Sequence, residues 1–272
     1  MRFDSPQVDK QVRLMPEGDS IHRLANRFNT QCEGSKICKV TARQVHRSDR
    51  LLGAGVLTTE ALGKHLLIHL DNDHIIHTHL GREGRWIFKR TQELRRASNG
   101  LRLRLVFKNI TADCLDPRTI EVLTHDELRR HQLLGGLGPD ILSQSTDWAQ
   151  IYERIKRKQP MSVADMLLDQ SICSGIGNVY KSEVLFLEQR HPLTAPSALQ
   201  ATEIKALYQR ARRLMRRNLG ANPRRTRWAD GPKLWVYNRN KAPCLVCGTL
   251  IGRFRQGQPP RSTYLCRTCQ SH

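Results

Sequence analysis

Apolar residues recur with different periods along the chain and divide it into segments. Residues 1–14 are polar and show no convincing period, so we interpret them as a leader that translation from Met15 would leave out. The next segment has apolar residues at the i, i+3, i+4 and i+7 positions of one helical face. We expect Asp19 or Ser20 to be the N-cap of this helix. The stripe consists of Ile21, Leu24, Ala25 and Phe28.

Between about residues 36 and 125 the pattern becomes that of short strands. Two apolar runs, 65–70 and 75–80, are separated by a turn at 71–73, and residues 101–107 alternate with period two. Such alternation is expected of a half-buried strand. Several short strands with regular turns indicate a β-sandwich or a barrel.

From about residue 145 the chain becomes helical. The longest predicted helix covers 201–219, with Gly220 as its C-terminal stop, and a shorter one, 179–189, follows Gly175-Ile176-Gly177-Asn178. Residues 221–243 are basic and irregular and lead into a cysteine cluster.

Four cysteines form two Cys-x2-Cys pairs separated by eighteen residues. Each pair can place two thiolates on one ion, and four thiolates are typical of structural Zn²⁺, with no position left for water. The segment between the pairs predicts a β-hairpin with a turn at 256–259. Redox-active pairs are the alternative, but no thioredoxin-like βαβ pattern surrounds them. The predicted zinc ligands are Cys244, Cys247, Cys266 and Cys269.

The charge of the chain points to a polyanionic partner. Lys plus Arg number 45 and Asp plus Glu 25, which gives a net charge of +20 and a pI near 10.2. Nucleic acid is the usual partner of such a protein; a solubilising basic surface and an acidic membrane surface are the alternatives. We find no apolar run long enough to span a membrane and no signal peptide, and we therefore expect a cytoplasmic, nucleoid-associated protein.

Four motifs in order carry a family resemblance. They are residues 15–18 (MPEG), 63–67 (GKHLL), 168–183 (from LDQ to GIGNVYKSE) and 261–264 (RSTY) before Cys266. In this order the chain resembles the formamidopyrimidine-DNA glycosylase and endonuclease VIII family, and more closely the endonuclease VIII branch.

The resemblance implies an α+β protein in three units that bind DNA between them. We expect a catalytic β-sandwich domain with an N-terminal helix (15–140), a helix–two-turn–helix DNA-binding domain (141–235) and a C-terminal β-hairpin zinc finger (236–272). The implied activity is that of a bifunctional DNA glycosylase and abasic-site lyase of base excision repair. Its implied substrate is double-stranded DNA with oxidised bases, pyrimidines favoured, or abasic sites. We expect a monomer.

The resemblance also assigns roles at the reacting sugar. Pro16 would be the nucleophile once Met15 is removed, because an α-amino group has a pKa of about 7.7–8.0 against about 10.4 for lysine. Glu17 would be the general acid and base. Lys64 would hold phosphate and supply a proton for β-elimination, and Arg261 would clamp phosphate and support δ-elimination. Taken singly, each residue also has an ordinary structural role.

Further residues are assigned to DNA binding. Asn178, at the start of a helix, would bind a phosphate beside the lesion. A flipped base leaves a hole in the duplex, and the family fills it from loops that match Arg118 and Ile120, with Arg82 in the remaining loop. Arg82 stands where the formamidopyrimidine branch has Met, and Ser20 stands where both branches commonly have Glu.

The leader leaves other functions open. If the active chain keeps residues 1–14, Pro16 is an internal amide, and the protein would bind damaged or abasic DNA without cutting it. A zinc-ribbon transcription or RNA factor is a further alternative. We expect one structural Zn²⁺, because the five histidines between 65 and 79 have no carboxylate at matching spacing.

Overall fold

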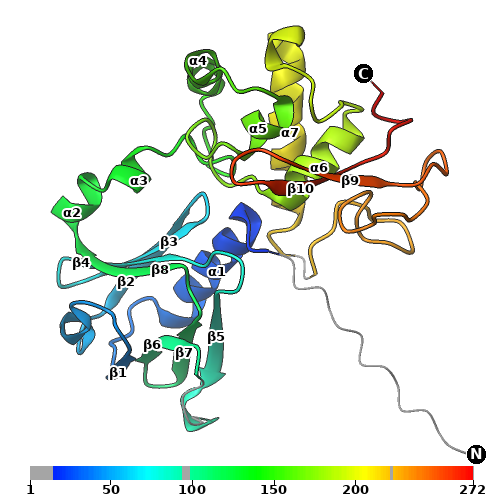
Figure 1. Cartoon of the computed structure of the whole chain (residues 1–272). Coiled ribbons are helices and arrows are strands. Elements are labelled where there is room, and N and C mark those ends of the chain that lie inside the picture. Colours follow the sequence, from blue (N-terminus) through cyan, green and yellow to red (C-terminus); the bar gives the residue numbers. More distant parts are fainter. Residues whose placement is uncertain (1–14, 94–98, 221–222, 272) are drawn as a thin grey trace, which may run out of the picture.

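The computed structural model of the 272-residue chain describes residues 15–93, 99–220 and 223–271, and the predicted leader lies outside these ranges. It has two lobes (Figure 1). One lobe holds the first helix and all strands up to residue 124, and the other holds the later helices and the C-terminal hairpin.

The first helix, α1 (Gly18–Cys32), buries the apolar stripe that the sequence predicts, including Ile21, Ala25 and Phe28. Its N-cap is Glu17, so the prediction of Asp19 or Ser20 is wrong. Asp19 lies inside the first turn, where its carboxylate binds the guanidinium of Arg224 at 2.5 and 2.9 Å.

Two four-stranded antiparallel sheets form the predicted β-sandwich. The first has the order β1-β6-β7-β5 and the second the order β2-β3-β4-β8. The strands of the first sheet are β1 (Lys39–Ala42), β5 (Arg85–Arg90), β6 (Leu101–Val106) and β7 (Ile110–Leu115). Those of the second are β2 (Val56–Leu62), β3 (His65–Leu70), β4 (His74–His79) and β8 (Thr119–Thr124).

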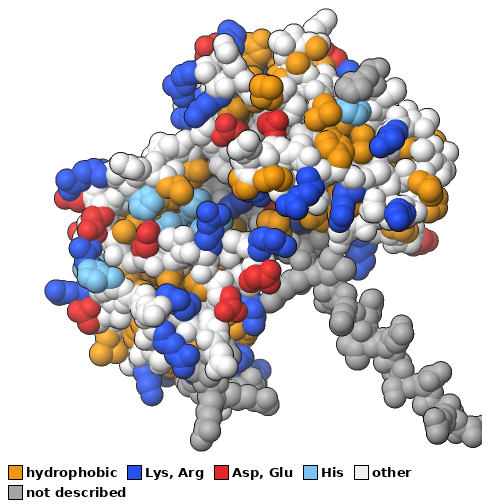
Figure 2. All heavy atoms as spheres, viewed as in Figure 1, with side chains coloured by type: hydrophobic (Ala, Val, Ile, Leu, Met, Phe, Trp, Pro, Cys, Tyr) orange, Lys and Arg blue, Asp and Glu red, His pale blue; other side chains and the backbone are white. Residues whose placement is uncertain are grey.

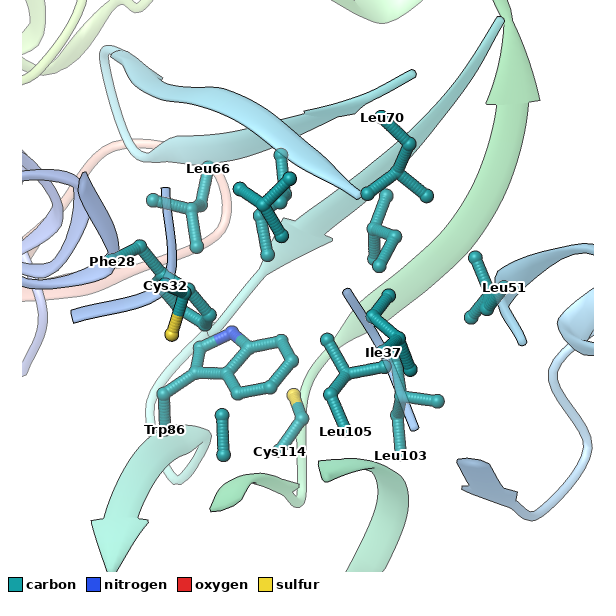
Figure 3. Close-up of a cluster of buried hydrophobic side chains, with 14 of the residues drawn as sticks. Phe28, Cys32, Ile37, Leu51, Leu66, Leu70, Trp86, Leu103, Leu105 and Cys114 are labelled. Carbon is teal, nitrogen blue, oxygen red and sulfur yellow. The ribbon is translucent and has the colours of Figure 1, made fainter. Parts of the chain in front are cut away.

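The inner faces of the sheets and α1 enclose the sandwich core (Figure 3). Phe28 of α1 meets Trp86 and Phe88 of β5 edge-on, with ring centroids 5.0 and 4.7 Å apart. Edge-to-face contacts of this kind stabilise aromatic pairs beyond their burial. They fix α1, and with it the start of the folded chain, against the sandwich.

A connector of two short helices, α2 (His125–Arg129) and α3 (Gln132–Gly135), leads to the helical lobe. The longest helix there, α7, ends at Arg217 rather than near Gly220. Asn218 is its C-cap, and the side-chain amide of Asn218 donates to Leu214 O at 2.8 Å. The helices of the lobe are α4 (Trp148–Lys158), α5 (Val163–Leu168), α6 (Asn178–Leu187) and α7 (Ala201–Arg217). Within the described residues there are also three 3-10 helices, η1 (Ser48–Leu51), η2 (Thr91–Glu93) and η3 (Pro196–Ala198).

The C-terminal hairpin pairs β9 (Gly252–Gln256) with β10 (Arg261–Leu265), and its turn lies where the sequence predicts it. The hairpin lies against α6 (Figure 1). The predicted α+β architecture of sandwich, helical region and terminal hairpin is therefore confirmed. In the part of the chain that the structure describes, no helix has the length and apolar character to cross a bilayer.

Candidate active site

Glu17 is held at the N-terminus of α6, in the opposite lobe. Its buried carboxylate accepts the backbone N–H groups of Gly177, Val179 and Tyr180 at 3.0, 2.8 and 3.3 Å. The positive end of a helix dipole favours a carboxylate at this position. Because Pro16 precedes Glu17, these bonds also place Pro16 at the junction of the two lobes.

Two glycines make this close approach possible. A Cβ on Gly177 would lie 2.4 Å from Glu17 Cδ, so no other residue fits under the carboxylate. Gly175, at φ +107°, accepts the Gly18 N–H at its carbonyl oxygen at 2.9 Å. The GIGN motif at 175–178 thus contacts and positions the segment that begins at Pro16.

Arg224 completes the buried polar network around Pro16. Its guanidinium binds Asp19, donates to Ser20 Oγ at 2.7 Å and to Met15 O at 3.1 Å, and lies 4.0 Å from Glu17. Sequence reasoning missed Arg224, because nothing in the irregular basic segment 221–243 distinguishes it from a surface arginine.

Lys64 stands at the tip of the β2–β3 hairpin. The preceding Gly63 has a φ of +60°, donates its N–H to Asp140 at 2.7 Å, and lies so close to Ser174 that a Cβ would be 2.7 Å away. The hairpin therefore reaches across to the helical lobe. Burial lowers the pKa of Lys64 to about 8; Glu17 opposes this shift, while Arg261 favours it.

Arg261 enters the site from β10. No hydrogen bond to its side chain is found among the described residues, so its donors are available to a ligand. Its neighbour Ser262 accepts the Asn178 amide at the backbone oxygen, 2.7 Å away. Lys181 bridges the same elements, with Nζ 2.8 Å from Asn178 Oδ1 and 2.7 Å from Thr263 Oγ1.

Lys181 is fully buried, and burial lowers its pKa to about 7. Its contacts join α6 to β10 and fix the start of β10 near Lys64. Sequence reasoning missed this role of Lys181. A lysine within a mostly apolar and buried helix could have indicated it.

The predicted void-filling residues lie around the turn before β8. Arg118 donates its backbone N–H to His79 O at 2.9 Å and packs on Gly81, where a Cβ would be 2.9 Å from Arg118 Cβ. Arg82 is exposed in the turn after β4. Ile120 pairs with Thr78 within the sheet and is half-buried against the sandwich core. The structure therefore brings Arg118 beside the Arg82 turn and leaves Ile120 on the strand.

Lys and Arg side chains gather along the junction of the two lobes (Figure 2). Charge of this kind attracts a polyanion, because its binding releases counterions. Lys64 and Arg261 both lie at this junction, close enough for the charge of Arg261 to act on Lys64.

The four predicted zinc ligands come together at the base of the hairpin, with all four sulfurs within 4.8 Å of one another. Cys244 and Cys269 Sγ are 3.9 Å apart, and Cys247 and Cys266 Sγ are 3.4 Å apart. Zn–S bonds of about 2.3 Å in a tetrahedron give separations of about 3.8 Å, whereas a disulfide requires about 2.05 Å. The donor set fits a structural Zn²⁺.

Comparison with known proteins identifies the family. Residues 15–123 match the formamidopyrimidine-DNA glycosylase N-terminal domain, and residues 137–228 match the formamidopyrimidine-DNA glycosylase H2TH domain. The chain belongs to the formamidopyrimidine-DNA glycosylase and endonuclease VIII family. The predicted family is therefore confirmed.

Relatives place the chain near the endonuclease VIII branch of this family. It is 34% identical to a probable endonuclease 8 2 of Streptomyces coelicolor, over 94% of each chain. It is 33% identical to the DNA-(apurinic or apyrimidinic site) lyase Nei2 of Mycolicibacterium smegmatis, over 94% of this chain and 99% of the relative.

Solved structures of the family share the fold. The formamidopyrimidine-DNA glycosylase of Thermus thermophilus superposes with a TM-score of 0.79 at 24% identity, over 94% of this chain and 99% of that one. The Lactococcus lactis protein, solved with DNA that contains an abasic site, gives a TM-score of 0.80 at 22% identity, over 94% of this chain and all of that one.

Proposed function

We propose that the chain is a bifunctional DNA glycosylase and abasic-site lyase of base excision repair. The observation that carries this proposal is the position of Pro16 and Glu17 at the N-terminus of α6, in the same site as Lys64 and Arg261. Its relatives named as endonuclease 8 and as an abasic-site lyase support the same conclusion.

In the proposed reaction the imino nitrogen of Pro16 attacks C1′ of the damaged nucleotide. The N–C1′ bond forms as the bond from C1′ to the base breaks, and the departing base takes a proton from water. The Glu17 carboxylate accepts the proton that the Pro16 nitrogen loses and passes it to the ring oxygen O4′, which opens the sugar ring. The resulting iminium is an electron sink. Loss of a C2′ proton then breaks the bond to the 3′ phosphate, and a second elimination releases the 5′ phosphate. Water finally hydrolyses the iminium and frees Pro16.

The electrostatics of the site support these roles. Three N–H donors of the helical lobe hold the Glu17 carboxylate next to Pro16. Lys64 and Arg261 supply positive charge for the phosphates that leave.

A free Pro16 nitrogen requires translation from Met15 and removal of that methionine. The family match that begins at residue 15 supports this start. We further propose one structural Zn²⁺ on the four cysteines and functional units of 15–140, 141–235 and 236–272. Nothing in this scheme requires more than a monomer.

For DNA binding, we propose that Asn178 binds a phosphate beside the lesion, and that Arg118, Ile120 and Arg82 fill the space left by the flipped base. The proposed substrates are oxidised pyrimidines in double-stranded DNA and abasic sites. A net charge of +20 supports a nucleoid-associated protein.

Borohydride trapping tests the proposal, because borohydride reduces an iminium to a stable amine. Protein translated from Met15 and protein that retains residues 1–14 are each incubated with abasic-site DNA. We expect a covalent adduct only with the first, and a weaker adduct or none with its P16G variant. An adduct formed equally well by protein shown by intact mass to retain the leader would exclude Pro16. DNA binding without any adduct from an exposed Pro16 would favour the alternative of a non-cutting binder.

A cleavage panel defines the lesion class. Duplexes with thymine glycol, dihydrouracil, 8-oxoguanine or an abasic site are compared under single-turnover conditions. Faster excision of 8-oxoguanine than of both pyrimidine lesions would contradict the proposed pyrimidine preference and leave the lyase proposal standing.

A further inference from the structure

The outer face of the second sheet carries histidines that the proposed reaction does not use. Histidine side chains reach the surface of the sandwich lobe near the lobe junction (Figure 2). His77 of β4 and Glu121 of β8 are direct cross-strand partners. The connector covers this face: His131 is the N-cap of α3, and Leu134 packs in a small apolar cluster with Leu67 of β3.

Three possible metal ligands from three segments converge here. His77 Nδ1 lies 2.9 Å from Glu121 Oε2, His131 Nε2 lies 3.2 Å from the same oxygen, and the three ligand atoms are all within 4.8 Å of one another. Tetrahedral Zn²⁺ with bonds of about 2.0–2.2 Å separates its ligands by about 3.3–3.6 Å. A cation therefore needs only small side-chain shifts to enter.

The surroundings of His77 are those of a metal ligand. Its ring is 1% exposed, and its second nitrogen, Nε2, lies 2.8 Å from His65 Nδ1. A histidine that binds a metal through one nitrogen usually donates the proton of the other to a neighbouring acceptor, which fixes the ring. His65 is in place for this. His131 and Glu121 are 20% and 39% exposed, so an ion has a path from solvent.

We propose that His77, Glu121 and His131 form a second cation site that takes Zn²⁺. Two imidazoles and one carboxylate are a donor set that Zn²⁺ favours, with a fourth position for water. The ion would join β4 and β8 to the connector, and so fasten the sandwich to the segment that leads into the helical lobe. The site is separate from the four cysteines and does not depend on the proposed DNA chemistry.

One existing contact must open for the ion to bind. Leu134 donates its N–H to His131 Nδ1 at 3.3 Å, but a cation on Nε2 places a proton on Nδ1. The contact is longer than the usual N–H donor range of about 2.7–3.2 Å, so binding gives up a weak hydrogen bond. Spacing along the sequence could not reveal this carboxylate, because Glu121 and His131 join the histidines only through the fold.

The test is the zinc content of full-length protein equilibrated with excess Zn²⁺ and freed of unbound ion. We expect two ions per chain in the wild type and one in E121Q and in H131N. The matched control is E60Q, because Glu60 also pairs with a histidine on this sheet, His69 at 2.9 Å. Among the described residues no third ligand converges on that pair, so E60Q should keep both ions.

Cobalt substitution identifies the ligands of each ion. The four cysteines give intense thiolate-to-cobalt charge transfer, whereas a site of two imidazoles and a carboxylate gives only weak ligand-field bands. We expect the second equivalent of Co²⁺ to add only the weak bands, and H131N to lose them. One ion per chain in the saturated wild type, or a second ion that both E121Q and H131N retain, overturns the proposal. H131N removes a ligand outside the sheet, so it remains a test if E121Q does not fold.

Discussion

Replacement of Gly177 by Ala tests whether Glu17 is held by the helical lobe. The new Cβ would lie 2.4, 2.5 and 2.6 Å from Cδ, Oε1 and Cγ of Glu17. These contacts are too short to persist, so the carboxylate must leave the three N–H donors of α6. Hydrogen bonds to a charged group contribute about 1.5–3 kcal/mol each, and water replaces part of them, so we expect a loss of about 3 kcal/mol in the free energy of unfolding.

The same displacement removes the proposed general acid. A loss of about 3 kcal/mol lowers Tm by about 6–12 °C in a protein of this size, and loss of general acid catalysis lowers single-turnover excision about 100-fold or more. Excision is measured well below the Tm of the variant. The matched control is G135A, since a Cβ there meets nothing within 4 Å. Wild-type Tm and excision in G177A would refute the position assigned to Glu17.

Three further predictions concern Lys64, the buried ion pair and the finger. The ammonium form of Lys64 is present below its pKa of about 8 and is lost as pH rises through it. Therefore kcat/KM for abasic-site cleavage should fall above about pH 8, and K64R should shift that fall to higher pH. The same fall at the same pH in K64R would count against Lys64. Breaking the buried Arg224–Asp19 pair in R224Q should lower the free energy of unfolding by about 3–5 kcal/mol. In urea unfolding, the R224Q/D19N double variant should lose less than the sum of the two single variants, and simple additivity would contradict the pairing. C247S should lose its zinc and bind DNA about tenfold or more weakly, because the metal folds the finger. C38S, which changes an exposed cysteine, should keep both the zinc and the DNA affinity. DNA affinity retained without zinc would show that the finger does not contribute to DNA binding.

The sequence predicted those features that depend on short-range pattern. Period-two runs and the 71–73 turn predicted the sandwich, and the Cys-x2-Cys pairs predicted the cluster at the hairpin. Pro16, Glu17, Lys64 and Arg261 were found through the order of motifs, since none of them is distinctive alone.

The remaining features depend on tertiary contacts that no local pattern records. Arg224 becomes a buried partner of Asp19 only because its irregular segment folds back on α1. Glu17 is the N-cap of α1 while its carboxylate faces α6, so the choice between Glu17, Asp19 and Ser20 depended on the other lobe. Glu121 reaches His131 only because the connector covers the sheet.

The hydrogen bonds between Glu17 and α6 mean that the proposed catalytic site is complete only when both lobes contribute to it. A hinge movement that separated the lobes would withdraw Glu17 from its donors and carry the Lys64 hairpin away from Ser174. Under the proposed mechanism, catalysis therefore requires the two lobes to be closed, and the sandwich cut from the rest of the chain would carry Pro16 and Lys64 without the contacts that align them.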